Sequence, residues 1–201
     1  NIITNYKNYI KIKIGKKIIS KKNKAFIIAE IGVNHNGKYE IAKKLIDKAI
    51  LCGADCVKFQ TFKAEYVANK KTKLANYQIK NKVKEQNQFD MLKKLELSEQ
   101  IFKKLYLYCK KKKIEFLSTP VSFSDVDFLN NLGVKAFKLA SMHASEPEFI
   151  KYVASKNKPI IASTGMCNFE EVKSMIRIFK KSKNNKVCIL QCTSNYPSKI
   201  E

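Results

Sequence analysis

Two lysines stand inside apolar runs of this 201-residue sequence, where a charge is unexpected. Lys58 lies in Val-Lys-Phe-Gln at 57–60, and Lys138 lies in Phe-Lys-Leu-Ala at 137–140. Buried lysines are rare unless an anion accompanies them. With hydroxyl groups nearby, two ammonium groups make a binding site for a phosphate or a carboxylate. The alternative is that both lysines pair with Glu30 and fill the interior, although one carboxylate cannot neutralise two ammonium groups.

Glu30 is a third charge with apolar neighbours on each side. A buried carboxylate is costly unless it is paired or functional. Glu30 therefore either bridges to a nearby lysine or takes part in chemistry, and its own segment leaves both readings open. The polar turn that follows, Asn34–Gly37, places this acid where a strand ends and a loop begins.

The other apolar runs also end in polar residues. These are Gln60, Ser118, Thr119, Ser141, Ser163, Thr164, Thr193, Ser194, Asn195 and Tyr196. The carboxyl ends of parallel strands meet at one face of an α/β fold, and sites are built there. The sequence therefore predicts one cationic, hydroxyl-lined site at that face.

The elements that must position these residues follow from the periodicity of the apolar positions. We expect strands at 25–30, 55–61, 114–118, 136–141, 159–163 and 187–191, and helices at 39–52, 98–112, 124–132, 146–155 and 169–181. Ser145 with Glu148, and Asn168 with Glu171, have the spacing of helix N-terminal caps. Residues 62–97 form a long polar connection with a short helix near 88–95, and a connection of that length is usually functional.

Strands that alternate with helices predict a parallel sheet. Because the sequence has no glycine-rich dinucleotide fingerprint, we favour a (β/α)8 TIM barrel over a doubly wound sheet. About six βα units are present, whereas a full barrel takes about 250 residues. We therefore interpret the chain, which starts with Asn, as a fragment. Residues 1–24 form an N-terminal segment whose alternating 10–19 stretch predicts a hairpin that closes the barrel bottom, and 25–201 form the truncated barrel.

Composition restricts the class of protein. The chain is 45% hydrophobic and 28% charged, and it shows neither a membrane-length apolar run nor a signal peptide, so we expect a cytoplasmic globular protein. Six cysteines without a C-x-x-C pair predict free thiols.

The net charge of +23 raises the hypothesis of nucleic-acid binding. Against it, Arg177 is the sole arginine, and the lysines are spread over most of the predicted helices rather than gathered in one stripe.

Six short motifs resemble the sialic acid synthase family, which includes N-acetylneuraminate and legionaminate synthases. They are Ala-Glu-Ile-Gly-Val-Asn-His-Asn-Gly (29–37), Val-Lys-Phe-Gln-Thr-Phe (57–62), Ser-Thr-Pro (118–120), Phe-Lys-Leu-Ala-Ser (137–141), Ser-Thr-Gly-Met (163–166) and Cys-Thr-Ser-Asn-Tyr-Pro (192–197). The resemblance implies condensation of phosphoenolpyruvate with an N-acetylated mannose-type sugar, giving a nine-carbon 2-keto sugar acid and phosphate. It also implies a homodimer and a divalent metal, Mn or Mg. The metal ligands and a C-terminal antifreeze-like domain are then expected beyond residue 201.

The same resemblance assigns roles to individual residues. It implies a phosphoenolpyruvate site made of Lys58, Thr119, Lys138, Ser141 and Ser163. It implies a sugar site made of Glu30, Gln60, His143, Asn195 and Tyr196, with Glu30, Lys58 and Lys138 as the catalytic groups. His143 stands where N-acetylneuraminate-forming members are expected to have an acid, and Ser194 stands where an asparagine can occur. Both departures suggest another acceptor, the 2,4-diacetamido-6-deoxy sugar used for legionaminic acid.

Three alternatives stay open at this point. The first is another phosphoenolpyruvate–sugar synthase, of the octulosonate or heptulosonate phosphate type, which would need a second cationic cluster for its phosphorylated acceptor. The second is an inactive truncated paralogue, and we expect the 201 residues alone to be inactive. The third is a basic nucleic-acid-binding module, for which steeply salt-dependent retention on DNA would be the sign. The resemblance itself implies small-molecule substrates and neither a nucleic-acid nor a membrane partner.

Overall fold

A curved wall of parallel strands forms the centre of the computed structural model, which describes residues 11–74, 85 and 87–194. Its strands are β3 (Ile28–Gly32), β4 (Cys56–Thr61), β5 (Glu115–Pro120), β6 (Phe137–Leu139), β7 (Ile160–Ser163) and β8 (Val187–Leu190). Hydrogen bonds join β3–β4–β5 and β6–β7–β8 into two sheets, and β5 packs beside β6. All pairings within these two sheets are parallel.

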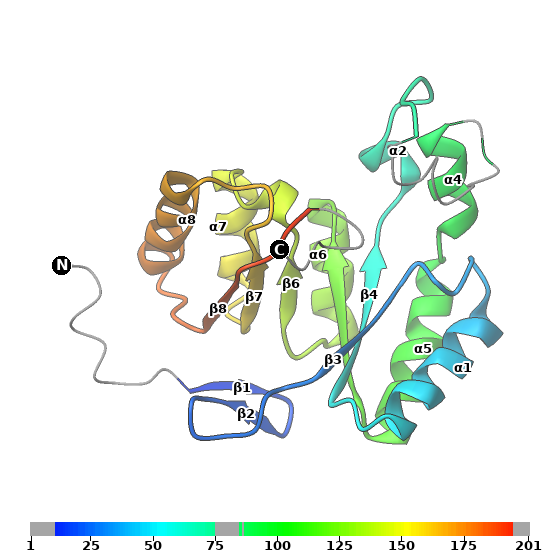
Figure 1. Cartoon of the computed structure of the whole chain (residues 1–201), viewed down its shortest axis with the longest axis horizontal. Coiled ribbons are helices and arrows are strands. Elements are labelled where there is room, and N and C mark those ends of the chain that lie inside the picture. Colours follow the sequence, from blue (N-terminus) through cyan, green and yellow to red (C-terminus); the bar gives the residue numbers. More distant parts are fainter. Residues whose placement is uncertain (1–10, 75–84, 86, 195–201) are drawn as a thin grey trace.

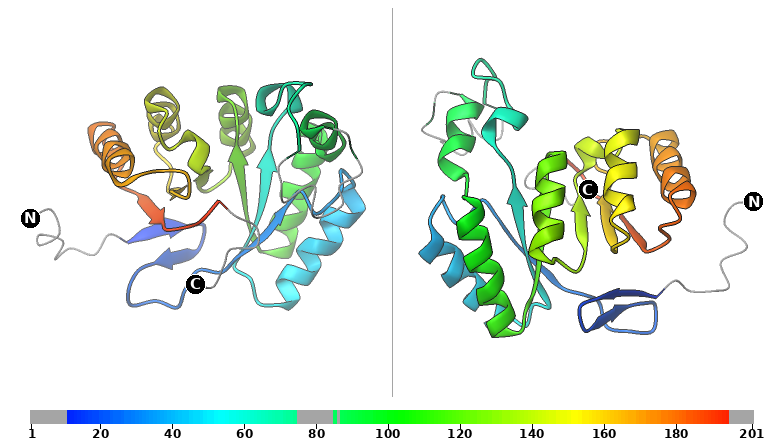
Figure 2. Two further views of the ribbon diagram at one scale, coloured as in Figure 1. Left: turned by 45° about the horizontal axis from the view of Figure 1, so that its top comes forward. Right: turned by 180° about the vertical axis from the view of Figure 1, so that it is seen from behind.

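Helices follow the strands and lie along the convex side of the wall (Figure 2). They are α1 (Tyr39–Leu51), α2 (Ala64–Val67), α4 (Gln88–Leu95), α5 (Glu99–Lys112), α6 (Phe123–Leu132), α7 (Pro147–Ser155) and α8 (Phe169–Lys181), with a 3-10 turn η1 (Ser141–His143). The repeated strand–helix order confirms the predicted α/β barrel architecture, and the barrel is not closed.

The two faces of the strands bury different cores. Residues such as Phe59, Phe116 and Phe137 point toward the helices and join the larger core. The alternate residues point to the concave side, where Cys56, Leu117, Ala136 and Ile161 form a second cluster with two residues of the hairpin. Because side chains alternate along a strand, this partition fixes which polar residues face the concave side.

The predicted N-terminal hairpin is confirmed. Strands β1 (Ile12–Ile14) and β2 (Lys17–Ile19) pair antiparallel and lie near the amino ends of the wall strands (Figure 1). Ile12 and Ile14 are 5% and 0% exposed and pack into the inner cluster. The hairpin therefore closes the bottom of the concave side.

One predicted cap is wrong. Helix α7 begins at Pro147 with Glu146 as N-cap, and no side chain caps it. Proline at the first helical position has its φ preset for the helix, and the N–H that it lacks would have had no partner within the helix, so the helix starts there without Ser145. Glu148 instead bonds Lys151 at 2.6 Å. The cap of α8 is confirmed, with Asn168 and Glu171 bonding each other's backbone N–H groups at 2.9 and 2.8 Å.

Two further differences concern the site. Strand β6 ends at Leu139 rather than at residue 141, so Ser141 lies in η1. The connection after β4 contains the predicted helix α4 and also the unpredicted α2, and these two helices pack together. Four residues are too few to show a helical period, which is why α2 left no signal in the sequence.

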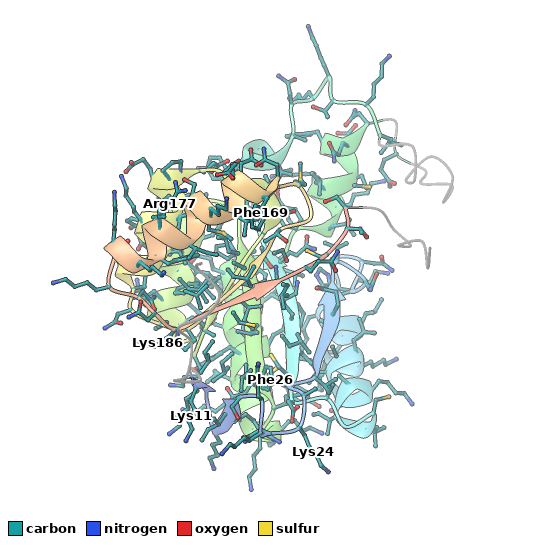
Figure 3. All side chains as sticks on the ribbon, turned by 60° about the vertical axis from the view of Figure 1, so that its left-hand side comes forward. Lys11, Lys24, Phe26, Phe169, Arg177 and Lys186 are labelled. Atoms are coloured by element: carbon teal, nitrogen blue, oxygen red, sulfur yellow. The ribbon has the colours of Figure 1, made fainter. Side chains whose placement is uncertain are left out.

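Charge is dispersed over the molecule. Figure 3 shows nitrogen-tipped side chains projecting on many sides, with Lys11 and Lys24 near the hairpin and Arg177 on α8. In the part of the chain that the structure describes, no helix is long and apolar enough to cross a membrane. All six cysteines are free thiols, as predicted.

Candidate active site

A polar layer lies directly above the inner apolar cluster on the concave side. At five of the six wall strands an inner residue is apolar, and the residue two positions later, which faces the same way, is polar. The pairs are Ile28 and Glu30, Cys56 and Lys58, Leu117 and Thr119, Ala136 and Lys138, and Ile161 and Ser163. The polar residue is always the one nearer the carboxyl end of its strand, so these groups share one end of the wall.

Lys58 and Glu30 form an ion pair across neighbouring strands. The two residues are partners in the parallel register of β3 and β4, so their side chains leave the sheet together. Lys58 is largely buried, with 12% of its side chain exposed, whereas Glu30 is 51% exposed. The carboxylate therefore neutralises Lys58 on one side and opens to solvent on the other.

Lys138 has a different environment. It is 7% exposed, and its ammonium group donates to the Ser163 hydroxyl and, at 2.9 Å, to the Leu139 carbonyl. Both acceptors are neutral. Burial, followed by the positive charge of Lys58, lowers the pKa of Lys138 from 10.5 to about 8. The alternative in which Glu30 pairs with both lysines is therefore wrong for Lys138.

Glu30 and Gln60 share the outer rim of this layer. A Cβ atom on Gly32 would lie 3.1 Å from Glu30 Oε1 and 3.7 Å from Gln60 Nε2. The register of β3 is interrupted between Glu30 and Gly32, and Gly32 has φ +53°, a conformation that favours glycine. Gln60 is also the register partner of Thr119, whose side chain is buried. Hydrogen-bonding groups thus continue from the rim down to the lysines.

His35 supports this rim, a role that the sequence analysis did not find. It is 1% exposed, its ring stacks on Phe59, and its Nδ1 accepts from the Gly37 N–H at 3.0 Å. Burial lowers the pKa of His35. A hydrogen bond with the Gly32 backbone raises it by a smaller amount, so the ring is neutral near pH 7. The available signal was the place of His35 in a turn rich in Asn and Gly directly after a predicted buried strand.

Other predicted site residues have hydrogen-bond partners that are not the lysines. Ser118 precedes Thr119 in β5, so its side chain points to the opposite face, toward the helices. There it forms a hydrogen bond with Thr61 at 2.7 Å. His143 is buried against the ring of Phe149 at 4.1 Å, bonds Glu146 at 2.8 Å and leaves Nε2 without a partner.

Ser141 lies in η1, where its carbonyl accepts a thiol hydrogen bond from Cys167. Asn195 and Tyr196 lie outside the described residues.

Helices α2 and α4 lie beyond the carboxyl end of β4, on the side where the polar layer opens (Figure 1). Lys93 links them by bonding Glu65 at 2.8 Å and Glu96 at 3.2 Å. The long polar connection therefore adds a wall beside the site. Its remaining part, residues 75–84 and 86, is outside the described range.

The geometry suits a small anion. A buried ammonium group whose hydrogen-bond acceptors are neutral keeps a positive charge that an anion can compensate. The hydroxyls beside it can donate hydrogen bonds to phosphate or carboxylate oxygens. Across residues 11–74, 85 and 87–194 no three His, Cys, Asp or Glu side chains gather as a metal site.

Known proteins share sequence and fold with this chain. A sequence profile of the NeuB family matches residues 45–201. The chain belongs to the NeuB family. This NeuB chain is 45% identical over 177 residues to an N,N'-diacetyllegionaminic acid synthase of Campylobacter jejuni, covering 87% of the chain and 53% of that protein. It is 35% identical over 180 residues to an N-acetylneuraminate-9-phosphate synthase of Mus musculus, covering 90% and 50%.

A solved structure gives the same result for the fold. The N-acetylneuraminic acid synthetase of Leptospira borgpetersenii, in complex with citrate, superposes with a TM-score of 0.83 at 28% identity. The match covers 96% of the NeuB chain and 62% of that chain. The NeuB chain spans about half the length of the curated relatives that it matches, 53% and 50% in the two cases above.

Proposed function

We propose that the protein containing this chain condenses phosphoenolpyruvate with an N-acetylated mannose-type sugar, forming a nine-carbon 2-keto sugar acid and phosphate. The observation that carries the proposal is the buried ammonium group of Lys138. Its two hydrogen-bond acceptors, the Ser163 hydroxyl on the neighbouring strand and the Leu139 carbonyl, are neutral, and Lys58 lies within electrostatic range. A doubly anionic donor supplies the negative charge that this layer lacks. Two relatives are named as synthases, one of N,N'-diacetyllegionaminic acid and the other of N-acetylneuraminate 9-phosphate.

The donor site consists of Lys58, Lys138, Thr119 and Ser163, with Ser141 beside it. Two ammonium groups take the phosphate and carboxylate of phosphoenolpyruvate, and the hydroxyls donate to the remaining oxygens. Anion binding favours the charged form of Lys138, so its pKa of about 8 rises again in the complex.

The acceptor sugar binds at the rim. Glu30 is half exposed and pairs with Lys58, so the side of its carboxylate that faces solvent can accept hydrogen bonds from sugar hydroxyls or take a proton from one of them. Gln60 offers an amide next to it. Asn195, Tyr196 and His143 complete the proposed sugar site by family resemblance.

The proposed reaction forms one carbon–carbon bond. The enol carbon of phosphoenolpyruvate attacks the aldehyde carbon of the open-chain sugar, and the aldehyde oxygen gains a proton to become a hydroxyl. Water adds to the resulting cationic carbon, and phosphate leaves as its carbon–oxygen bond breaks. The lysines stabilise the negative charge of the donor and of the departing phosphate.

The family resemblance also brings a divalent metal, Mn or Mg, which would polarise the aldehyde as a Lewis acid. The described side chains do not supply a ligand set for it, so no step above passes through a metal. Homodimer formation and a cytoplasmic location stay predictions.

The product is proposed to be of the legionaminic acid type. His143 in place of an acid, and Ser194 beside Asn195, depart from the pattern of N-acetylneuraminate-forming members. Identity to the Campylobacter legionaminic acid synthase is 45%, against 35% to the mouse N-acetylneuraminate-9-phosphate synthase. The second candidate product is N-acetylneuraminic acid itself.

The test uses protein expressed from its complete coding sequence. Phosphoenolpyruvate is supplied with either N-acetylmannosamine or the 2,4-diacetamido-6-deoxy sugar, and phosphate release and product mass are measured. If the bridging oxygen of phosphoenolpyruvate is oxygen-18, carbon–oxygen cleavage transfers that label to phosphate. Phosphate release that needs no sugar, or no turnover with either sugar, would refute the proposal.

Glu30→Gln tests the proposed acceptor role. Because the amide keeps the shape but cannot take a proton or balance Lys58, we expect turnover to fall by about 100-fold or more. Glu40→Gln, on the exposed surface of α1, is the matched control and should leave turnover unchanged. Full activity in Glu30→Gln would remove this residue from the chemistry.

A further inference from the structure

An open cavity lies at the amino ends of the wall strands, whereas the polar layer lies toward their carboxyl ends. Its volume is about 640 Å³, and it is bounded by strand β1 with its turn and by residues at or just before the starts of β5, β6, β7 and β8. Cavities of roughly 300–1,000 Å³ commonly hold small molecules. The charged side chains that line this cavity are Lys11, Lys13, Lys16, Glu115, Lys135 and Lys186.

The hairpin brings its lysines to the cavity because its strand alternates. The two isoleucines of β1 are buried in the inner cluster, so Lys11 and Lys13, which alternate with them, stay exposed beside the cavity. Gly15, in the turn, has φ +55°, and a Cβ atom added there would overlap the carboxylate of Glu115. The hairpin turn therefore lies directly against the start of β5.

The wall contributes two further lysines. Lys135 stands two residues before β6, and Lys186 immediately precedes β8. Lys186 lines the cavity together with Lys11, at the hairpin end of the molecule (Figure 3). The ammonium group of Lys186 donates to the backbone and side-chain oxygens of Asn157 at 2.8 and 3.0 Å, and both acceptors are neutral. Lysines from distant parts of the chain thus meet at one cavity.

The positive charge of the cavity is not balanced by carboxylates. Five lysines and the one carboxylate of Glu115 give its described lining a net charge of +4. Across residues 11–74, 85 and 87–194, none of the five lysines forms an ion pair. Asp55, whose backbone carbonyl accepts from the Glu115 N–H, is already paired with Lys17 at 2.8 Å and bonded by the Ile27 N–H at 2.9 Å.

A neighbouring lysine responds to this charge. Lys158 donates to the Asn130 carbonyl of α6 at 3.2 Å. Burial lowers the pKa of Lys158, and the positive charge of Lys135 lowers it further. On the helices the situation is reversed: Lys112 and Lys156 bond carboxylates at 3.0 and 2.7 Å, and the pKa of each is raised. Repulsion between lysines is therefore a property of the cavity end and not of the whole surface.

We propose that this cavity binds the polyphosphate group of a small molecule, with lysines of the hairpin and of the strand starts around it. A nucleoside triphosphate carries about four negative charges near pH 7, which matches the charge of the lining, whereas a single phosphate carries at most about two. Lysines on flexible stems from several segments can each contact a different phosphate. No aromatic side chain is present in the described lining, so the phosphate chain rather than a base is the recognised part. This site is independent of the proposed reaction.

Calorimetry on the protein expressed from its complete coding sequence tests the ligand class. The probes are inorganic tripolyphosphate, ATP and AMP, at about 0.1 M NaCl with EDTA present so that no metal bridges the phosphates. We expect tripolyphosphate and ATP to bind at least about tenfold more tightly than AMP, because linked phosphates reach more lysines. ATP that binds more tightly than tripolyphosphate would identify a nucleotide as the source, and the reverse would identify inorganic polyphosphate. Equal binding of AMP and ATP, or no binding of either polyphosphate, would overturn the proposal.

A pair of double variants tests the location. Lys13→Gln with Lys135→Gln removes one exposed lysine from each side of the cavity, so tripolyphosphate should bind about tenfold or more weakly. Lys104→Gln with Lys111→Gln removes the same charge from the exposed surface of α5 and should change the affinity by less than about twofold. Equal losses in the two double variants would mean general attraction to a positively charged protein and would overturn the site.

Two competition measurements exclude other sites and partners. Saturating phosphoenolpyruvate should leave tripolyphosphate affinity within about twofold, and strong competition would assign tripolyphosphate to the lysine layer of the donor site instead. If phosphoenolpyruvate does not bind, the proposed function fails, and the double variants alone decide the site at the amino ends. A single-stranded oligonucleotide that binds more tightly than tripolyphosphate, and is weakened by the Lys13 and Lys135 substitutions, would make the partner a nucleic acid and overturn the proposal.

Discussion

Replacing Lys138 by Met should make the protein more stable while abolishing anion binding. The ammonium group is 7% exposed, and the fall of its pKa from 10.5 to about 8 measures the free energy of keeping it charged in the fold. At about 1.4 kcal/mol per pKa unit this is about 3 kcal/mol at pH 7. Met has a similar length and no charge, but the variant loses two hydrogen bonds worth about 1 kcal/mol each. The expected net gain is about 1 kcal/mol.

The pH dependence of this gain follows from the direction of the shift. The folded pKa lies below the unfolded one, so between about 8 and 10.5 the unfolded chain binds more protons than the folded chain. Stability of the unsubstituted protein therefore rises with pH through this window. The advantage of Lys138→Met is full below pH 8 and shrinks as the pH increases toward 10.5.

Urea denaturation at pH 7 and pH 10 measures both effects, and calorimetry with phosphoenolpyruvate measures binding. Lys104→Met, on the exposed surface of α5, controls for a general effect of the substitution and should change stability by less than about 0.5 kcal/mol. A marked loss of stability in Lys138→Met at pH 7, or a difference from the unsubstituted protein that is the same at both pH values, would refute the reasoning.

Two glycines and one serine give further tests. Gly37→Ala should lower stability by at least about 2 kcal/mol, because φ is +70° and the new Cβ would sit 2.4 Å from the Lys94 carbonyl oxygen. Gly53→Ala, with φ +77° and nothing within 4 Å, should lose only about 1 kcal/mol. Ser118→Ala should lose about 1–2 kcal/mol by breaking the buried bond to Thr61, with unchanged phosphoenolpyruvate affinity.

Urea denaturation serves for the three variants, with calorimetry for the last. Equal losses in the two glycine variants would contradict a clash at Gly37. A Ser118→Ala protein that binds phosphoenolpyruvate about tenfold more weakly would contradict the placement of this hydroxyl on the helix side.

The sequence determined most of the secondary structure because its periodicity is strong. The helix predicted near 88–95 is Gln88–Leu95, and those predicted at 39–52 and 169–181 are Tyr39–Leu51 and Phe169–Lys181. The strand starting at 25 was placed too early, because Phe26 and Ile27 are as apolar as the residues that pair with β4. Apolar character alone does not show where hydrogen bonding to a neighbour begins.

The sequence also indicated which residues matter, since charges inside apolar runs need a reason. It did not determine how Glu30, Lys58 and Lys138 divide their contacts. That depends on the register, which makes Lys58 the direct partner of Glu30 and leaves Lys138 to Ser163 on another strand. Strand pairing is a long-range property that no local pattern encodes.

His35 marks the limit most clearly. In the sequence it is an ordinary residue of a polar turn. Its burial and its lowered pKa come from neighbours brought close only by folding, Phe59 and the Gly32 backbone. Composition and periodicity are local and survive in the unfolded chain, whereas burial, hydrogen-bond partners and pKa shifts exist only once distant segments pack together.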